Sequence, residues 1–292
     1  MKRHKAIITF LLLLASMVWI SIFTFPDKKL HLVACDVGQG DAILAIYGSY
    51  QILFDGGPGK DVVSCLGKYI PFWDKEIEVV VLTHPEKDHY GGLVYVFREY
   101  KVDYFIANSL DSGSNEYSVL KNLVGGGATK VVNPTTGMNV RLGLIHLDIV
   151  WPSKDFLTAN NVSYSSNVLG ISSEKDGVNE FSVVAKLSLG DFDAILTGDI
   201  DQGISNMLVE KNLINQADYV KIPHHGSKNG ITQKLLEKLN PAFAVISVGK
   251  NSYGHPYKEI LDMLEVLGIR YERTDKYGDI EIVTDGKEWY LK

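Results

Sequence analysis

The sequence predicts an α/β protein in which two mixed β-sheets pack against each other and helices cover the outside. Each half of the chain begins with short strand-like apolar runs and ends in alternating helical and strand-like patterns, an order that suits this arrangement. The composition, 46% hydrophobic and 22% charged, is that of a globular protein. The 292 residues contain no internal repeat, so a repeat architecture is excluded.

The N-terminal end differs from the rest of the chain. Residues 6–25 carry no charge and follow the basic stretch KRHK. At about 1.5 Å per residue, a helix of this length is about 30 Å long, enough to cross the hydrocarbon core of a bilayer. We predict a membrane anchor within residues 1–29 and an outer domain, 30–292, on the extracytoplasmic side, because the basic flank stays inside. Secretion after cleavage of the segment as a signal peptide is the alternative.

The predicted outer domain is acidic. The whole chain carries a net charge of −6, and residues 1–29 hold five Lys or Arg and one Asp, so residues 30–292 carry about −10. Broad nonspecific binding to nucleic acid usually comes with a basic surface, which this domain lacks. A polyanionic substrate would need metal ions or a few lysines, and Lys221, Lys228 and Lys250 flank the late motifs.

The chain has two cysteines, Cys35 and Cys65. An outside compartment permits a disulfide. Two cysteines in so long a domain are no disulfide framework, so we predict two buried thiols.

Apolar patterns and turn residues predict the elements in chain order. In the first half we expect strands at 30–37, 41–47, 51–54, 79–82, 102–106 and 130–132, and helices at 61–69, 93–100 and 115–124. In the second half we expect strands at 138–150, 181–189, 192–196, 219–222, 242–248, 279–283 and 289–291, and helices at 231–239 and 257–267. Residues 153–180, rich in Ser, Asn, Asp and Gly, are predicted to be a long surface loop.

Polar side chains that can bind metals follow three of the predicted strands. THPEKDHYGG, residues 83–92, follows a buried apolar strand and brings two histidines and two carboxylates into six residues. Asp199 in LTGDI and the pair His224-His225 in KIPHHGS also follow predicted strands. Active sites commonly lie at strand ends in open sheets, and these residue types bind divalent metals. The three segments together predict a metal site.

These segments belong to a longer series of motifs. The chain resembles the metallo-β-lactamase superfamily, whose signature is H-x-H-x-D-H, and more narrowly the hydrolase domain of the ComEC family of DNA-uptake proteins. The motifs that carry the resemblance are DVGQGDA (36–42), LFDGG (53–57), THPEKDHYGG (83–92), NEFSVV (179–184), ILTGDI (195–200), KIPHHGSKNG (221–230) and SVGKNSYGHP (247–256). They cover nearly the whole outer domain. The resemblance implies an αββα sandwich with a two-metal site between its sheets.

The resemblance also assigns roles to residues of this chain. It implies His84 for a first metal, Asp88 and His89 for a second, Asp199 as a bridge, and either His225 or His224 to complete the second site, with His225 favoured. The implied metal-binding residues are His84, Glu86, Asp88, His89, Asn179, Asp199 and His225. The implied catalytic residues are Asp88, His224 and His255.

Two departures from the superfamily affect the first metal. Glu86 replaces the middle histidine of the signature, and the histidine expected before the TGD turn is missing. Asn179 could supply an oxygen there, whereas His146 reads as a solvent-facing strand residue. The site is therefore oxygen-rich and suits zinc or manganese, with magnesium as a further option. Other residues expected to border it or to support its ligands are Asp36, Gln39, Asp41 and Asp55.

The predicted activity is metal-dependent hydrolysis. Two divalent cations lower the pKa of a water molecule and stabilise a developing oxyanion. Lactam-cleaving relatives usually carry cysteine where this chain has Asp199, so the resemblance favours a phosphodiesterase or nuclease, with single-stranded DNA as the implied substrate. Hydrolysis of another ester, lactam or lactone bond, and a degenerate binding module without catalysis, are the alternatives. The sequence indicates no protein partner.

Overall fold

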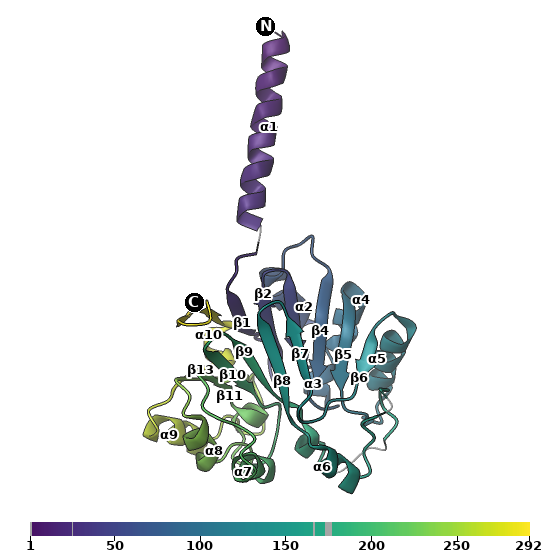
Figure 1. Cartoon of the computed structure of the whole chain (residues 1–292), viewed down its shortest axis with the longest axis vertical. Helices are drawn as coiled ribbons and strands as arrows, with labels where there is room; N and C mark the ends of the chain where they lie inside the picture. Colours follow the sequence, from purple (N-terminus) through teal and green to yellow (C-terminus); the bar gives the residue numbers. More distant parts are fainter. Residues whose placement is uncertain (1, 25, 166, 173–176) are drawn as a thin grey trace.

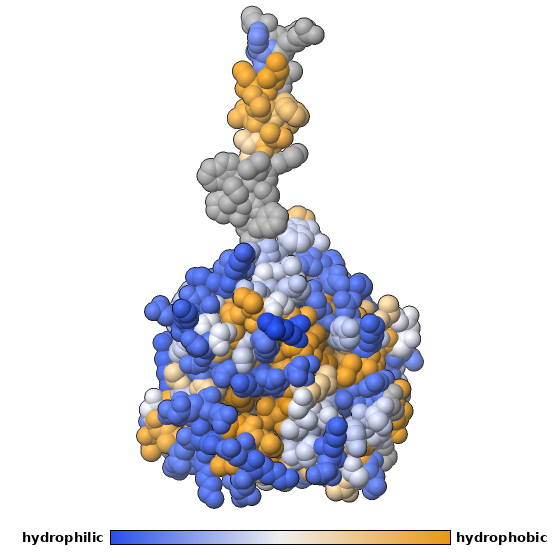
Figure 2. Space-filling view, viewed as in Figure 1, coloured by the Kyte–Doolittle hydropathy of each residue, from blue (hydrophilic) through white to orange (hydrophobic). Residues whose placement is uncertain are grey.

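The computed structural model describes residues 2–24, 26–165, 167–172 and 177–292. Helix α1 (Lys2–Thr24) stands apart from the body of the protein, and its described part carries exposed apolar side chains between Ile7 and Leu14 (Figures 1 and 2). Among the described residues, no helix has the length and apolar character needed to cross a bilayer. The predicted anchor, residues 6–25, includes residues 17–25, whose side chains lie outside the described part, so the anchor stays a prediction.

The described residues of the body form two β-sheets. The first sheet has the strand order β15-β14-β1-β2-β3-β4-β5-β6, in which β3 to β6 run parallel and the other neighbours antiparallel. Its strands are β1 (Leu30–Ala34), β2 (Ile43–Tyr47), β3 (Tyr50–Phe54), β4 (Glu76–Leu82), β5 (Lys101–Ala107), β6 (Lys130–Val132), β14 (Ile280–Thr284) and β15 (Trp289–Leu291).

The second sheet has the order β13-β12-β11-β10-β9-β8-β7, with β10 to β13 parallel. Its strands are β7 (Asn139–Leu142), β8 (Ile145–Trp151), β9 (Val184–Leu189), β10 (Phe192–Leu196), β11 (Tyr219–Lys221), β12 (Phe243–Ile246) and β13 (Arg270–Arg273). Strand β11 lies inside the sheet, between β10 and β12, so its side chains are buried.

Helices cover the outer face of each sheet. On the first sheet they are α2 (Asp61–Tyr69), α3 (Lys87–Tyr90), α4 (Leu93–Glu99) and α5 (Asn115–Gly126). On the second they are α7 (Gln202–Glu210), α8 (Gln233–Leu239) and α9 (Lys258–Val266), and the shorter helices are α6 (Lys154–Ala159), α10 (Thr274–Tyr277) and the 3₁₀ turns η1 (Val178–Phe181) and η2 (Pro223–Gly226).

Three apolar clusters match these layers. One is formed by the strand faces that meet between the sheets, and it includes Val79 and Ala194. The other two lie between each sheet and its own helices, around Leu93 in the first half and Leu235 in the second. The predicted arrangement of two packed sheets with helices outside is confirmed, and Figure 1 shows both helical layers.

The main local differences from prediction lie in the second half. Helix α7 was not predicted, although Asp201 caps it by accepting a hydrogen bond from the Ile204 N–H. The predicted surface loop at 153–180 begins with helix α6, capped by Ser153. Residues 166 and 173–176 of that loop lie outside the described part. The available signal for α7 was the helical spacing of Ile204, Met207 and Leu208, whereas α6, with six residues, is too short to show a clear period.

The prediction of two buried thiols was wrong, because Cys35 and Cys65 form a disulfide. Cys35 follows β1 and Cys65 lies on the inner face of α2, which packs on that sheet, so their Cα atoms are 5.9 Å apart. This separation is within the usual range for a disulfide. The sequence showed the two residues but not that the fold brings them together.

Removing the disulfide is expected to destabilise the protein. The bond closes a loop across a sequence separation of 30 residues, so the double variant Cys35→Ala and Cys65→Ala should lose about 2–4 kcal/mol of unfolding free energy. Urea denaturation of the oxidised wild type and the variant measures the difference. A reducing agent should produce a similar loss in the wild type and none in the variant, and equal stability of the two proteins would contradict the prediction.

Candidate metal centre

The three segments singled out in the sequence meet at the edge where strands of both sheets end. Strand β4 leads into Thr83 and His84, β10 leads into Asp199, and β11 leads into His225. The turn before Asp199 requires glycine, because Gly198 has a φ of +54° and a Cβ there would lie 2.9 Å from the Thr83 Cβ. The two sheets therefore contact each other closely at this turn.

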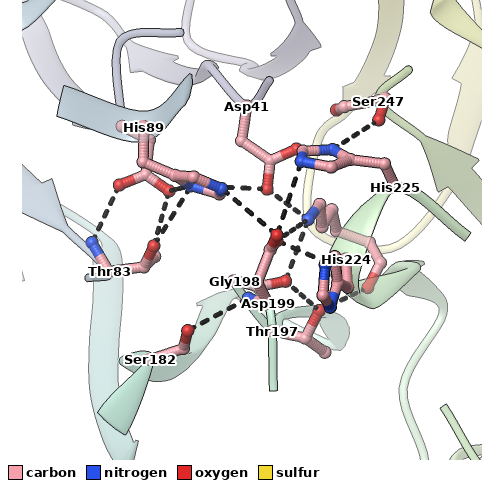
Figure 3. Close-up of polar contacts among 12 residues, drawn as sticks. Asp41, Thr83, His89, Ser182, Thr197, Gly198, Asp199, His224, His225 and Ser247 are labelled. Atoms are coloured by element: carbon pink, nitrogen blue, oxygen red, sulfur yellow. Dashed lines mark hydrogen bonds and ion pairs between the residues drawn. The ribbon is translucent and has the colours of Figure 1, made fainter. Parts of the chain in front are cut away.

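Four side chains form what we call the principal group: Asp88, His89, Asp199 and His225. His89 Nε2 lies 3.3 Å from Asp199 Oδ2. His225 Nε2 lies 3.4 Å from the same oxygen and 3.2 Å from Asp88 Oδ2. Figure 3 shows Asp199 between the two imidazole rings. Both histidines and Asp199 are almost fully buried, whereas Asp88 is partly exposed.

In both imidazoles of the principal group, the Nδ1 atom, which points away from the other ligands, already has a hydrogen-bond partner. His89 Nδ1 lies 2.7 Å from Asp55 Oδ2, and His225 Nδ1 lies 2.9 Å from the carbonyl oxygen of Ser247. Because a carboxylate and a carbonyl only accept, each Nδ1 donates a hydrogen, and each Nε2 of the neutral ring presents a lone pair. Within the described residues, His89 Nε2 is buried without a hydrogen-bond partner. Two nitrogens and two carboxylates thus face one space, which fits a divalent cation.

The charges in the metal-free chain lead to the same conclusion. Burial disfavours a charged His225, but the carboxylates of Asp199 and Asp41 outweigh burial and raise its pKa to about 10. Burial also disfavours a charged His89, but the carboxylates of Asp199 and Asp55 outweigh it and raise the pKa of His89 well above its usual value. At Asp199, burial is outweighed by His225 and His89, which lower its pKa well below the usual value. The carboxylates of the site therefore favour a positive charge at Nε2 of His89 and of His225.

The backbone around His225 is strained. His224 and His225 have left-handed φ angles of 52° and 54°, which cost non-glycine residues about 1–3 kcal/mol each. Hydrogen bonds from the His224 N–H to Asp199 Oδ1, at 3.2 Å, and from the Tyr257 N–H to the Gly226 carbonyl, at 2.9 Å, hold the turn. This turn directs His225 toward the principal group and His224 toward Asn179.

A second set of donors, His84, Glu86 and Asn179, lies beside the principal group. His84 Nε2 is 3.6 Å from Glu86 Oε2, and a ring nitrogen of His84 lies within 4.8 Å of ligand atoms from His89 and Asp199. In the described part of the chain, His84 Nε2 and Asn179 Oδ1 are buried without hydrogen-bond partners. These unpaired atoms fit a second cation whose ligands are mainly oxygen.

Lys221 is a site residue whose position the sequence analysis misjudged. Its side chain is only 1% exposed, and Nζ donates to the Gly198 carbonyl at 2.9 Å and to Asp199 Oδ1 at 3.2 Å, and also forms an ion pair with Asp41. An ammonium group has three protons, and these three partners use them all. The expectation that Lys221 is available to a phosphate is therefore wrong, because its ammonium group binds Asp41 and Asp199 in the interior.

The charge of the whole site matches two divalent cations. Its carboxylates are Asp41, Asp55, Glu86, Asp88 and Asp199. The Lys221 ammonium compensates one of these five negative charges, which leaves four. Two divalent cations would make the site neutral and remove its repulsion of an anionic substrate.

No model of a protein family matches the chain. Over 282 residues the chain is 26% identical to ComE operon protein 3 of Bacillus subtilis, a match that covers 89% of this chain and 34% of that protein. It is 25% identical over 281 residues to competence protein ComA of Neisseria gonorrhoeae, which covers 92% of this chain and 34% of that protein. The chain thus spans about a third of the length of these curated relatives.

Solved structures decide the fold. YhfI of Bacillus subtilis, a metallo-β-lactamase fold protein, matches with a TM-score of 0.51 at 12% identity, over 84% of this chain and 97% of that one. The chain has the metallo-β-lactamase fold. Zinc-bound PqqB of Methylobacterium extorquens matches with a TM-score of 0.50 at 12% identity, over 80% of this chain and 85% of that one. Identities this low establish the fold alone.

The metallo-β-lactamase fold places most of the predicted supporting residues at the site. Asp55 accepts hydrogen bonds from the Thr83 N–H and from His89, as expected of a residue that orients a ligand. Asp41 lies beside His225, and Gln39 lines the cavity over the site. Asp36 does not reach the site: it is exposed, and its carboxylate accepts the N–H of Gly38 in its own loop.

Of the two remaining histidines considered in the sequence analysis, His255 lies at the site and His146 lies away from it. In this metallo-β-lactamase fold His255 lies at the site, with its ring 5.6 Å from that of His224. Burial, followed by the nearby His224 and His225, lowers the pKa of His255 to about 4, so it is neutral at pH 7. His146 lies exposed on β8, away from the site, as the sequence predicted.

Proposed function

We propose that the protein is a metal-dependent phosphodiesterase whose substrate is a single-stranded nucleic acid. The observation that carries this proposal is the principal group, in which two imidazoles, oriented from behind by Asp55 and Ser247, face Asp88 and Asp199. Divalent cations bound there would acidify a water molecule and stabilise negative charge on a phosphoryl oxygen.

The residues of this chain have distinct parts in that reaction. The principal group binds one cation, and His84, Glu86 and Asn179 support a second. The neutral His255 and the partly buried His224 line the cavity, and each can donate a hydrogen bond from a ring N–H to a substrate oxygen. The cluster and its five carboxylates favour hard, oxygen-seeking ions and a phosphodiester substrate over a lactam.

Two further observations support the substrate and the place of action. The relative from Neisseria gonorrhoeae is named a competence protein, although the chain spans only about a third of its length. The Cys35–Cys65 disulfide favours an oxidising compartment outside the cytoplasm. Attachment to the membrane through residues 6–25 remains a prediction from the sequence.

An assay of the full chain tests the proposal. The protein, loaded in turn with Mn²⁺, Zn²⁺ and Mg²⁺, is offered labelled single- and double-stranded oligonucleotides, bis-p-nitrophenyl phosphate and nitrocefin. We expect cleavage of the phosphodiesters and a loss of at least about 100-fold in Asp88→Ala, because that substitution removes a ligand of the principal group. Nitrocefin turnover without phosphodiester cleavage, or full activity in the variant, would contradict the proposal.

A further inference from the structure

The cavity over the metal centre carries an exposed aromatic side chain that the proposed chemistry does not use. The cavity has a volume of about 680 Å³, and its lining includes Asp88, His225 and His255 as well as Lys250 and Tyr253 from the loop after β12. Tyr253 is 67% exposed. An exposed tyrosine can form part of a binding site only if the loop that presents it has a fixed backbone.

A single side chain fixes the loop that presents Tyr253. Asn251 Oδ1 accepts hydrogen bonds from the N–H groups of Tyr253, Gly254 and His255, at 3.1, 3.0 and 3.1 Å. Its Nδ2 donates to the carbonyls of Gly249 and His255, at 2.8 and 2.9 Å. These bonds fix the backbone of the loop from which the exposed Tyr253 ring projects. A ligand that packs on a ring presented by a fixed backbone orders less of the protein when it binds.

The ring is also close to the metal centre. The Tyr253 and His255 rings are 5.8 Å apart and inclined by 31°, and the His255 ring is 6.5 Å from that of His225, a member of the principal group. Lys250 lies in the same loop, and no ion pair to it is recorded among the described residues. Lys87, which also lines the cavity, is by contrast paired with Glu116 at 2.9 Å.

We infer that Tyr253 is a stacking platform for a planar ring of the substrate, a nucleobase next to the phosphodiester at the metal centre, with Lys250 beside its phosphate. This inference rests on the proposed function and deepens it. Every nucleobase presents a flat face, so stacking on Tyr253 would select nucleic acids over phosphodiesters without rings, without selecting a base sequence.

Kinetics of Tyr253 variants provide the first test. The wild type, Tyr253→Ala and Tyr253→Phe are compared on a single-stranded oligonucleotide and on an abasic oligonucleotide of the same length. We expect Tyr253→Ala to raise KM for the base-containing substrate by about 10-fold or more, with kcat and the abasic substrate little changed. Tyr253→Phe should retain wild-type KM. Tyr277→Ala is the matched control, because Tyr277 is 66% exposed and does not line the cavity. Equal effects of Tyr253→Ala on both substrates would overturn the inference.

A binding test separates this inference from the proposed function. Tyr253→Trp is combined with Asp88→Ala, so that no turnover is needed, and tryptophan fluorescence is followed during titration with both oligonucleotides. Quenching by the base-containing oligonucleotide alone supports the platform, even where the wild type shows no phosphodiesterase activity. Equal quenching by both oligonucleotides, or none by either, overturns it.

Discussion

Asp199→Asn should reduce the affinity of the protein for divalent metal by more than about 100-fold and abolish hydrolysis with it. Asp199 Oδ2 is the one oxygen that approaches both imidazoles, at 3.3 and 3.4 Å, and it also belongs to the set that includes His84. An amide presents a single neutral oxygen and an NH₂ group that repels a cation. The substitution therefore weakens both cation sites.

Isothermal titration of the metal-free full chain with Mn²⁺ and Zn²⁺ measures this loss independently of activity. Asp191→Asn is the matched control, because it makes the same chemical change at an exposed residue of the turn between β9 and β10. The control should bind metal as the wild type does. A variant Asp199→Asn with wild-type metal affinity would show that the principal group is not the cation site.

The architecture and the location of the site could be predicted from the sequence, for a clear physical reason. Buried strands such as β4 are continuous apolar runs, and the polar residues that end them, His84 and Asp199 among them, interrupt that pattern sharply. Since several parallel strands end at one edge, their following residues had to meet there. The choice of His225 over His224 is also supported by its contact with Asp88.

The disulfide and the burial of Lys221 were not predicted, because both depend on which elements become neighbours in the fold. The disulfide requires α2 to pack beside the end of β1, and nothing local to Cys35 or Cys65 encodes that contact. Lys221 was misjudged because a lysine next to a polar motif ordinarily faces solvent. The available signal was its place in the apolar run Tyr219–Ile222, which the structure places in the middle of the second sheet.

The burial of Lys221 predicts a stability effect that depends on metal. Lys221→Met replaces the side chain by an apolar one of similar length and leaves Asp41 and Asp199 facing each other without the ammonium. Removing one partner of a buried ion pair costs about 3–5 kcal/mol of unfolding free energy, because the remaining charge stays desolvated. With metal bound, a nearby cation compensates the carboxylates, so the loss should be smaller.

Urea denaturation of the full chain, in EDTA and in saturating Zn²⁺, measures the loss of unfolding free energy without and with bound metal. Lys234→Met, at an exposed position of α8, is the matched control and should change stability by less than about 0.5 kcal/mol. A double variant with Asp41→Asn distinguishes a charge effect from a packing effect: if repulsion between the carboxylates causes the loss, removing one of them restores part of the stability that Lys221→Met removes. If packing of the lysine stem were the cause, the two losses would add and metal would make no difference. The buried ammonium would then only fill space, and the charge balance inferred for this centre would fail.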